Sequence, residues 1–171
     1  MTFQLVEPIL LIGLGGVGAR LAEKAKKSLN SDCLLISHDQ KDLTIENSIK
    51  ISTKSVVNPS THLIRGSTLE TSDEIKKNIA NYSTVILMSN LAGKAGAGIG
   101  PIVSRICKQE QKNLLSFVVM PFKFEKERIF QSGIALKRIR QDSQCTIVVD
   151  NDALLDSNPD LTQNQCYDIS N

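Results

Sequence analysis

Residues 9–21, "ILLIGLGGVGARL", decide the fold, because an apolar run leads directly into a glycine-rich turn and then into a helical pattern. Residues 9–13 are apolar at nearly every position, which is typical of a strand buried on both faces of a parallel sheet. The glycines of the turn allow close backbone approach, and a helix N-terminus offers free N–H groups and a partial positive charge. The stretch therefore predicts a strand, a turn suited to a phosphate, and a helix.

Residues 84–108, "TVILMSNLAGKAGAGIGPIVSRICK", repeat this arrangement. The apolar run 84–88 predicts a strand, and the small residues of "AGKAGAG" (92–98) predict a second loop open to a phosphate. We expect the following helix to begin near Pro101, since proline is tolerated in a first helical turn. Ile102, Val103 and Ile106 would form its apolar side. The structural alternative is that the small residues serve close packing of helix against sheet.

Four more apolar runs, at 33–37, 49–51, 114–120 and 145–150, predict further strands. Such alternation of strands and helices predicts an α/β fold, a three-layer, doubly wound, mainly parallel sheet with helices on both faces. Ligands bind at the carboxyl ends of the strands in such folds. The loops that follow the apolar runs are therefore the candidate site.

The predicted helices are read from spacing and capping residues. The first helix would bury a face made of Val17, Leu21, Ala25 and Leu29. A helix within residues 70–82 would start at Thr71 or Ser72, with acidic residues in its first turn. Another, over 128–141, would bury a face that contains Ile129, Gly133 and Leu136. Residues 52–68 show no periodicity and are predicted to be an extended loop.

Composition limits the possible functions. The 171 residues suit one domain, and the formal net charge of +2, without any long Lys/Arg run, argues against nucleic-acid binding. The N-terminus does not resemble a signal peptide and no run approaches 18 apolar residues, so no transmembrane segment and a cytoplasmic location are expected. The cysteines are spread singly, so neither a metal site nor a disulfide framework is predicted.

The first glycine turn by itself also fits a dinucleotide-binding enzyme. Residues 13–18, "GLGGVG", have the G-x-G-x-x-G spacing, and Asp39 follows about 20 residues later, where a carboxylate would bind the ribose. An NAD(P)-dependent Rossmann enzyme is therefore one alternative. No catalytic histidine, Tyr-x-x-x-Lys pair or cysteine nucleophile is apparent beside it.

Several segments, taken together, resemble the tubulin/FtsZ superfamily. "AGKAGAG" resembles the G-G-G-T-G-[ST]-G signature, "IGLGGVG" the first FtsZ loop, and "ISHDQKDL" (36–43) the motif "INTDAQAL". "VVMPFKFEKER" (118–128) is similar to "VTKPFxFEGxxR", "TIVVDNDALL" (146–155) to "xIxIPNDxLL", and "CYDISN" (166–171) to "AFxxAN". The resemblance covers nearly the whole chain. The chain resembles the N-terminal GTP-binding domain of a divergent, for example archaeal, FtsZ-like protein.

The resemblance implies a guanine nucleotide, GTP or GDP, with Mg²⁺ as a candidate second cofactor. The first loop would meet the α- and β-phosphates, the second the β- and γ-phosphates, Glu125 the ribose, and Asn151 and Asn171 the guanine. Arg128 matches the family's arginine only if one residue is deleted beside Lys126. The candidate nucleotide-binding residues are Gly15, Gly16, Val17, Gly18, Ala19, Arg20, Asp39, Ala92, Gly93, Lys94, Ala95, Gly96, Ala97, Gly98, Glu125, Arg128, Asn151 and Asn171.

Two departures from the family pattern affect this site: Ala95 stands for the family's threonine, and Ala19 and Arg20 replace the asparagine-bearing turn of the first loop. Ala95 lacks the hydroxyl of the family's threonine, which would remove a hydrogen bond worth roughly 1.5–3 kcal/mol. Lys94 offers an ammonium as compensation, and Arg20 a second cation. A third interpretation follows from the missing groups, namely a nucleotide-free domain that keeps the fold and acts through protein contacts alone.

The resemblance also sets expectations for the whole chain. Residues 1–171 would be a single GTP-binding domain that ends at the start of the family's central helix, with the activation domain absent. In the family a neighbouring subunit's acidic loop completes the active site. No catalytic residue is therefore assigned within the chain, hydrolysis by the chain alone would be weak or absent, and self-association or association with another FtsZ-like subunit is expected.

Overall fold

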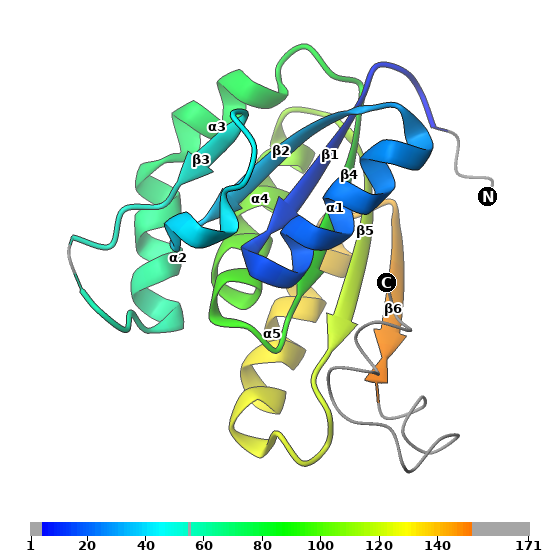
Figure 1. Ribbon diagram of the computed structural model, residues 1–171. Helices are drawn as coiled ribbons and strands as arrows, with labels where there is room; N and C mark the ends of the chain where they lie inside the picture. Colours follow the sequence, from blue (N-terminus) through cyan, green and yellow to red (C-terminus); the bar gives the residue numbers. More distant parts are fainter. Residues whose placement is uncertain (1–4, 55, 152–171) are drawn as a thin grey trace.

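Six parallel strands lie side by side in the order β3-β2-β1-β4-β5-β6 (Figure 1). They belong to a computed structural model that describes residues 5–54 and 56–151. Each strand coincides with a predicted apolar run to within two residues. The strands are β1 (Ile9–Leu14), β2 (Asp32–Ser37), β3 (Ser48–Lys50), β4 (Thr84–Asn90), β5 (Asn113–Met120) and β6 (Cys145–Asp150).

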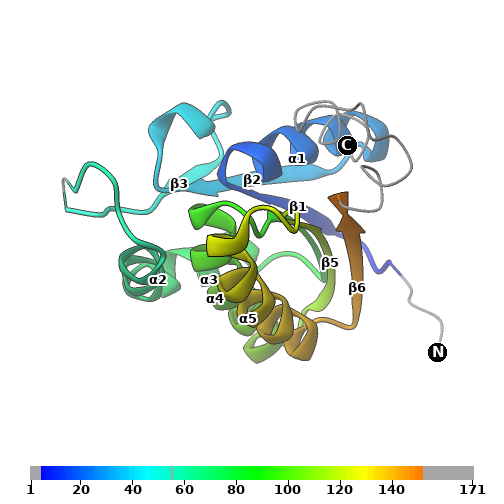
Figure 2. The ribbon, with the colours of Figure 1, turned by 90° about the horizontal axis from the view of Figure 1, so that it is seen from below.

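Helices cover both faces of the sheet, as predicted for a doubly wound fold. Helix α1 packs on one face, and α2 to α5 form a layer on the other (Figure 2). The helices are α1 (Gly15–Leu29), α2 (Thr61–Glu70), α3 (Ser72–Ile79), α4 (Lys94–Gln109) and α5 (Lys126–Asp142), with a short 3₁₀ turn η1 (Gln40–Asp42) after β2. Among the described residues, none of the helices is long and apolar enough to cross a membrane.

Side chains that alternate along β1 point to opposite faces of the sheet, and each face has its own hydrophobic core. Leu10 and Ile12 pack with Ile99 of α4, whereas Leu11 packs with Ala22 of α1. All these side chains are fully or almost fully buried. A strand that is apolar at successive positions therefore supplies both cores, which is what its sequence predicted.

The prediction of an extended loop over 52–68 is wrong in its second half. Helix α2 starts at Thr61, and the Ser60 hydroxyl caps it by accepting a hydrogen bond from the amide of Leu63, 3.2 Å away. Ile64 of α2 is fully buried in the main core. Capping and this tertiary contact outweigh the weak helical periodicity of the segment.

The second glycine stretch is helical earlier than predicted. Helix α4 begins at Lys94, so residues 94–98 form its first turns and Pro101 lies inside it rather than near its start. Only residues 91–93 connect β4 to α4, with Gly93 extended at φ −84° and ψ 148°. The expected apolar side is confirmed, because Ile102, Val103 and Ile106 are buried.

Two predicted helix faces are only partly correct, because Leu21 is buried and Ala25 and Leu136 pack against the core, whereas other members are exposed. Leu29 is 49% exposed at the end of α1, where the buried residues are Gly15, Gly18, Ala19, Leu21 and Ala22. In α5, Ile129 is 40% exposed and a Cβ built on Gly133 would meet nothing within 4 Å, while Ser132, Ala135 and Ile139 are buried. Small residues allow these helices to approach the sheet closely, so the large apolar side chains do not mark the buried face.

The start of α3 is predicted correctly, although its capping is not. Thr71 occupies the N-cap position and Ser72 begins the helix. The Thr71 hydroxyl instead donates to the carbonyl of Ser67, 2.9 Å away. Because α2 ends directly before α3, this hydroxyl serves the end of one helix and not the beginning of the next.

Candidate functional site

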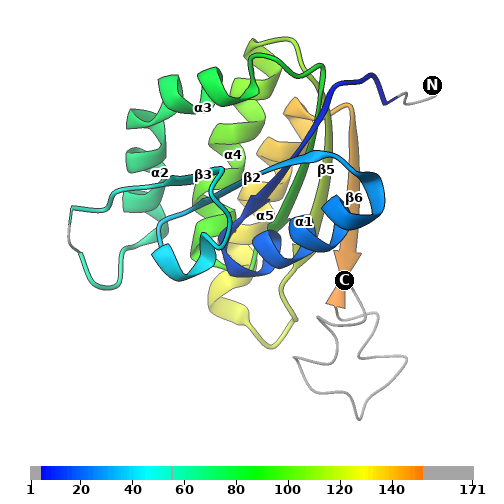
Figure 3. The ribbon, with the colours of Figure 1, turned by 45° about the horizontal axis from the view of Figure 1, so that its top comes forward.

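The two glycine stretches meet at the carboxyl edge of the sheet. Strands β1 and β4 are neighbours, and the chain leaves β1 into α1 on one face and β4 into α4 on the other (Figures 1 and 3). A Cβ placed on Gly15 would lie 2.9 Å from the Cβ of Ala95, so the first turns of the two helices are in contact. Such a switch point is where open α/β sheets bind ligands.

Both helix N-termini present amides that can bind an anion, and one carboxylate, that of Asp42, already lies beside the first turn of α1. Neither α1 nor α4 has a side-chain cap among the described residues, and neither carries an acidic residue in its first turn. The amides of Gly15, Gly16 and Val17, and those of Lys94, Ala95 and Gly96, precede the first intrahelical hydrogen bonds. Two sets of N–H groups and two positive dipole ends therefore converge on one place.

Several of the glycines are required by packing, as the structural alternative proposed. A Cβ on Gly96 would overlap the carbonyl oxygen of Asn90, and one on Gly18 would overlap that of Met88. A Cβ on Gly98 would lie 3.1 Å from the carbonyl oxygen of Thr61. Ala19 and Ala97 are likewise buried in separate core clusters.

Gly93 differs from those glycines, and Gly15 is required by its backbone conformation as well as by packing against Ala95. A Cβ on Gly93 would meet only the carbonyl oxygen of Asn90, at 3.5 Å, so packing does not explain the absence of a side chain there. Gly15 has φ +66°, a conformation that costs other residues energy. Beside Gly93, the amide of Ala92 donates to the side-chain oxygen of Asn90, 3.1 Å away. A phosphate could thus approach the backbone at Gly93 without displacing a packed side chain.

Lys94 places a cation at the first position of α4. Its ammonium donates a hydrogen bond to the side-chain oxygen of Asn58, 2.7 Å away, in the segment that precedes α2. It also lines a hollow of about 300 Å³, together with Arg128 and Gly93. Asn58 was not among the sequence candidates, because it lies 36 positions before Lys94 in a stretch without a recognisable motif.

The carboxylate that faces the first glycine turn is Asp42, not Asp39. The closest atom to a Cβ built on Gly16 is an oxygen of Asp42, at 3.0 Å, and a guanidinium nitrogen of Arg20 lies 3.8 Å from the same point. The hydroxyl of Ser37 donates to the other Asp42 oxygen at 2.7 Å. Asp39 is exposed, and its side chain accepts from the amide of Lys41 as the cap of η1.

The remaining candidates lie after β5 and β6. The carboxylate of Glu125 accepts from the amide of Phe122 at 2.8 Å and lies 3.7 Å from a guanidinium nitrogen of Arg128. Asn151 is fully buried, and its side-chain amide donates to the carbonyl of Met120 at 3.5 Å. Asn171 lies outside the described residues.

Two buried polar atoms near this edge have no hydrogen-bond partner among the described residues. They are Nδ1 of His38, just after β2, and the hydroxyl of Ser89, near the end of β4. The Ser89 hydroxyl lies 2.5 Å from a Cβ built on Gly96, under the first turn of α4. Over the same residues, no cluster of three or more His, Cys, Asp or Glu side chains could hold a metal ion.

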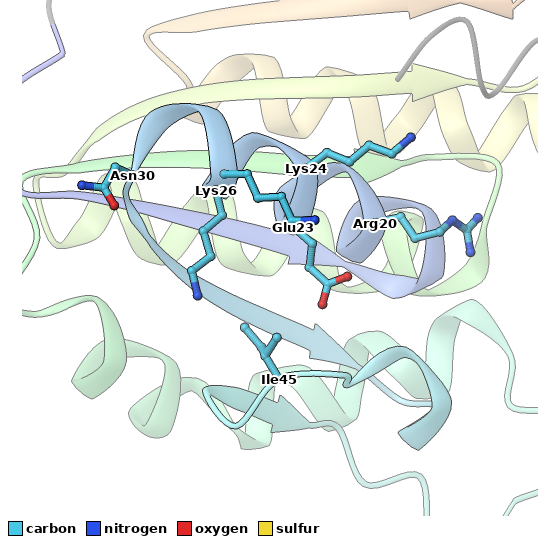
Figure 4. A pocket seen from close by; sticks show the side chains of 7 residues that line it. Arg20, Glu23, Lys24, Lys26, Asn30 and Ile45 are labelled. Atoms are coloured by element: carbon cyan, nitrogen blue, oxygen red, sulfur yellow. The ribbon is translucent and has the colours of Figure 1, made fainter.

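A larger hollow, of about 590 Å³, lies along the outer side of α1 (Figure 4). Arg20, Glu23, Lys24 and Lys26 line it from the helix, and Ile45 lines it from the segment after η1. It contains no helix N-terminus and is formed mainly by long, exposed side chains of a single helix. The carboxyl edge between α1 and α4 is therefore the better candidate site.

Comparison with known proteins identifies the family. A family model described as "Tubulin/FtsZ family, GTPase domain" matches residues 8–159. "Cell division protein FtsZ 2" of Halobacterium salinarum is 26% identical over 175 residues, covering 94% of this chain and 43% of the relative. The chain thus spans less than half of that curated relative.

Solved structures show the same fold. A chain of "FtsZ dimer, empty" from M. jannaschii aligns with a TM-score of 0.85 at 23% identity, over 95% of this chain and 50% of the other. "CetZ from Methanosaeta thermophila" aligns with a TM-score of 0.75 at 18% identity, over 95% of this chain. With the family model covering most of its length, the chain belongs to the tubulin/FtsZ family.

Proposed function

We propose that this chain is a GTP- and GDP-binding domain of a self-assembling, FtsZ/tubulin-like cytoskeletal or cell-division protein in the cytoplasm. The observation that carries the proposal is the pair of uncapped helix N-termini, α1 at Gly15 and α4 at Lys94, in contact at the switch point of the sheet. A chain of phosphates fits this arrangement, because it can accept hydrogen bonds from both sets of amides at once.

In this proposal each helix holds one part of the triphosphate. The amides of the first turn of α1 bind the α- and β-phosphates, and those of the first turn of α4 bind the β- and γ-phosphates. The open space at Gly93 allows the γ-phosphate to approach. The ammonium of Lys94 exchanges its hydrogen bond to Asn58 for one to the γ-phosphate, a charge-assisted bond that compensates for the missing hydroxyl at Ala95.

Ribose and guanine would bind toward β5 and β6. Glu125 binds the ribose hydroxyls after turning away from the amide of Phe122, and Arg128 lies beside it. Asn151, after leaving its buried contact with the carbonyl of Met120, reads the edge of the guanine together with Asn171, where a paired contact discriminates between bases by about 1–3 kcal/mol. Mg²⁺ would bind mainly through phosphates and water, with Asp42 as the protein carboxylate beside Gly16.

Hydrolysis is proposed to depend on a second subunit. None of the described residues of the proposed site is assigned as a catalytic base, and in the family an acidic loop from the neighbouring subunit positions the attacking water. This chain alone would therefore bind nucleotide and hydrolyse it slowly or not at all.

Strand order does not separate this proposal from the NAD(P) alternative, because a Rossmann enzyme has the same order. The match to the tubulin/FtsZ family model does favour the guanine nucleotide. Calorimetric titration of the purified chain with GTP, GDP, ATP and NAD, with and without Mg²⁺, tests the proposal. Preferential binding of GTP or GDP is expected. Preference for NAD would support the enzyme, and no binding of any nucleotide would support the nucleotide-free domain.

A further inference from the structure

A further hollow lies between α2 and α5, and it adjoins the hollow beside Lys94, since Ser60, Thr61 and Gln131 line both. These helices pack on either side of α4 (Figure 2), and between them remains a groove of about 330 Å³. We call it the α2–α5 groove and define it by Thr61 and Arg65 of α2 and by Phe130, Ile134 and Arg138 of α5. Its lining contains no carboxylate among the described residues.

Two cations face each other across this groove without a counter-charge. Among the described residues, neither Arg65 nor Arg138 has a carboxylate within 4.0 Å, although ion pairs form elsewhere on α4 and α5. The Nε atom of Arg65 is buried and has no hydrogen-bond partner among them. Burial, and secondarily the positive charge of Arg138, lower the pKa of the Arg65 guanidinium. An anion between the two side chains would accept a hydrogen bond from Arg65 and offset the repulsion between the two guanidinium groups.

The wall beside these cations is apolar and exposed. Phe130 is 75% exposed and Ile134 is 37% exposed. On α5 the positions 130, 134 and 138 are spaced by four, so the aromatic ring, the aliphatic side chain and the guanidinium follow one another along one side of the helix. Exposed apolar side chains that adjoin unpaired arginines are typical of protein interaction sites.

The small residues of α4 help to form the groove. A Cβ on Gly98 would lie 3.0 Å from a methyl group of Ile64 in α2, and one on Gly100 would lie 3.0 Å from a methyl group of Ile139 in α5. Each glycine therefore lets one flanking helix approach α4 closely. The glycines fix the separation of the two arginine-bearing helices.

We propose that the α2–α5 groove binds an acidic, partly apolar peptide segment of a partner protein. A carboxylate of the segment lies between Arg65 and Arg138, and an apolar side chain packs against Phe130 and Ile134. A volume of about 330 Å³ suits a few side chains. Nucleic acid is disfavoured because the chain has a net charge of only +2 and the groove offers an apolar wall instead of further cations. The proposal does not depend on nucleotide binding.

Fluorescence anisotropy with labelled heptapeptides tests this proposal on the full chain. The probes are two acidic peptides, ELDDLFE and DFEELID, and a basic control, KLKKLFK, which keeps the apolar residues of the first. At least one acidic peptide is expected to bind saturably, and the basic peptide is not. Arg65→Gln and Arg138→Gln should each weaken binding about tenfold, in line with the loss of a charge-assisted hydrogen bond. Phe130→Ser should also weaken it.

Arg140→Gln is the matched control, because Arg140 is an exposed cation on α5 that does not line the groove. It should leave peptide binding unchanged, and circular dichroism should show every variant folded. GTP titration of the same variants separates this proposal from the nucleotide proposal, since their affinity for GTP should match that of the parent. The proposal is overturned if neither acidic peptide binds, if the basic peptide binds equally well, or if Arg140→Gln weakens binding as much as Arg65→Gln.

Discussion

The ammonium of Lys94 donates a hydrogen bond to the side-chain oxygen of Asn58, 2.7 Å away, and ties the first residue of α4 to the segment before α2. A cation at a helix N-terminus opposes the helix dipole, at a cost of about 0.3–1 kcal/mol. Lysine at this position therefore does not stabilise α4 electrostatically. A role toward an anion explains it better.

Lys94→Ala is expected to weaken GTP binding by roughly 10- to 100-fold, because a hydrogen bond to a charged group contributes about 1.5–3 kcal/mol. GDP binding should change less, since the proposed contact is to the γ-phosphate. Calorimetry measures both. Arg105→Ala, which removes an exposed cation from the same helix, is the control and should leave GTP affinity unaltered. Unchanged GTP affinity in Lys94→Ala would show that this lysine is no phosphate ligand.

Gly93→Ala should separate folding from binding. The backbone at Gly93 suits alanine, and the added methyl group would make only an ordinary contact with Asn90, so the melting temperature should stay the same. If a phosphate approaches this backbone, the methyl group would hold it away and GTP affinity should fall about tenfold. Full GTP affinity in a folded Gly93→Ala protein would argue against phosphate contact there.

Gly96→Ala should destabilise the fold itself. The new Cβ would overlap the Asn90 carbonyl, and such overpacking costs about 1–3 kcal/mol, or roughly 2–12 °C in melting temperature for a domain of this size. Gly133→Ala is the matched change, since Gly133 is helical with open space around it, and it should stabilise by about 0.5–1 kcal/mol. Thermal unfolding of both variants checks the pair, and equal stability of the two would contradict the packing described here.

Alkaline pH should weaken the hydrogen bond between Tyr82 and Asp32, at the edge of the sheet opposite the candidate site. The Tyr82 hydroxyl donates to a carboxylate oxygen of Asp32 at 2.6 Å, and this bond raises the pKa of Tyr82 to about 12. The unfolded value is about 10. The folded-state pKa is the higher one, so the stabilisation is complete below about pH 10 and is lost as the pH rises toward 12.

The Tyr82→Phe variant lacks this ionisation. Its melting temperature should therefore fall less between pH 9 and pH 11.5 than that of the parent. The parent and the variant are each titrated by absorbance at the tyrosinate band. The difference between the two curves gives the ionisation of Tyr82 directly. A midpoint near pH 10 in that difference would contradict the hydrogen bond to Asp32.

The sequence predicted β1 well because burial on both faces leaves a continuous apolar run over residues 9–13. The apolar run 114–120 also marks β5 correctly, although its residues are mostly buried and half-buried in alternation. The sequence predicted the helices less well where small residues form the contacts. Ser132 and Ala135, not Ile129, face the core from α5. Helix α2 was missed because its stability comes from the Ser60 cap and the burial of Ile64, which local periodicity does not reveal.

For the site, sequence located the two glycine stretches but not their partners. The proximity of Gly15 and Ala95 follows from the pairing of β1 with β4, which no local pattern specifies. Asn58 and Asp42 were missed for the same reason, because each reaches the site through the tertiary fold. Asp39 was predicted from its spacing after the glycine turn, whereas it is Asp42, in the turn η1, that lies beside Gly16.

Binding of a nucleotide at the two helix N-termini can be observed directly in ¹H–¹⁵N correlation spectra of the labelled chain during titration with GTP and Mg²⁺. The largest shifts are expected at the backbone amides of residues 15–17 and 93–96, while the amides of Asp32 and Tyr82, at the far edge of the sheet, stay in place. Shifts confined to the outer side of α1, or no shift at either helix N-terminus at saturating GTP, would show that the nucleotide does not bind there.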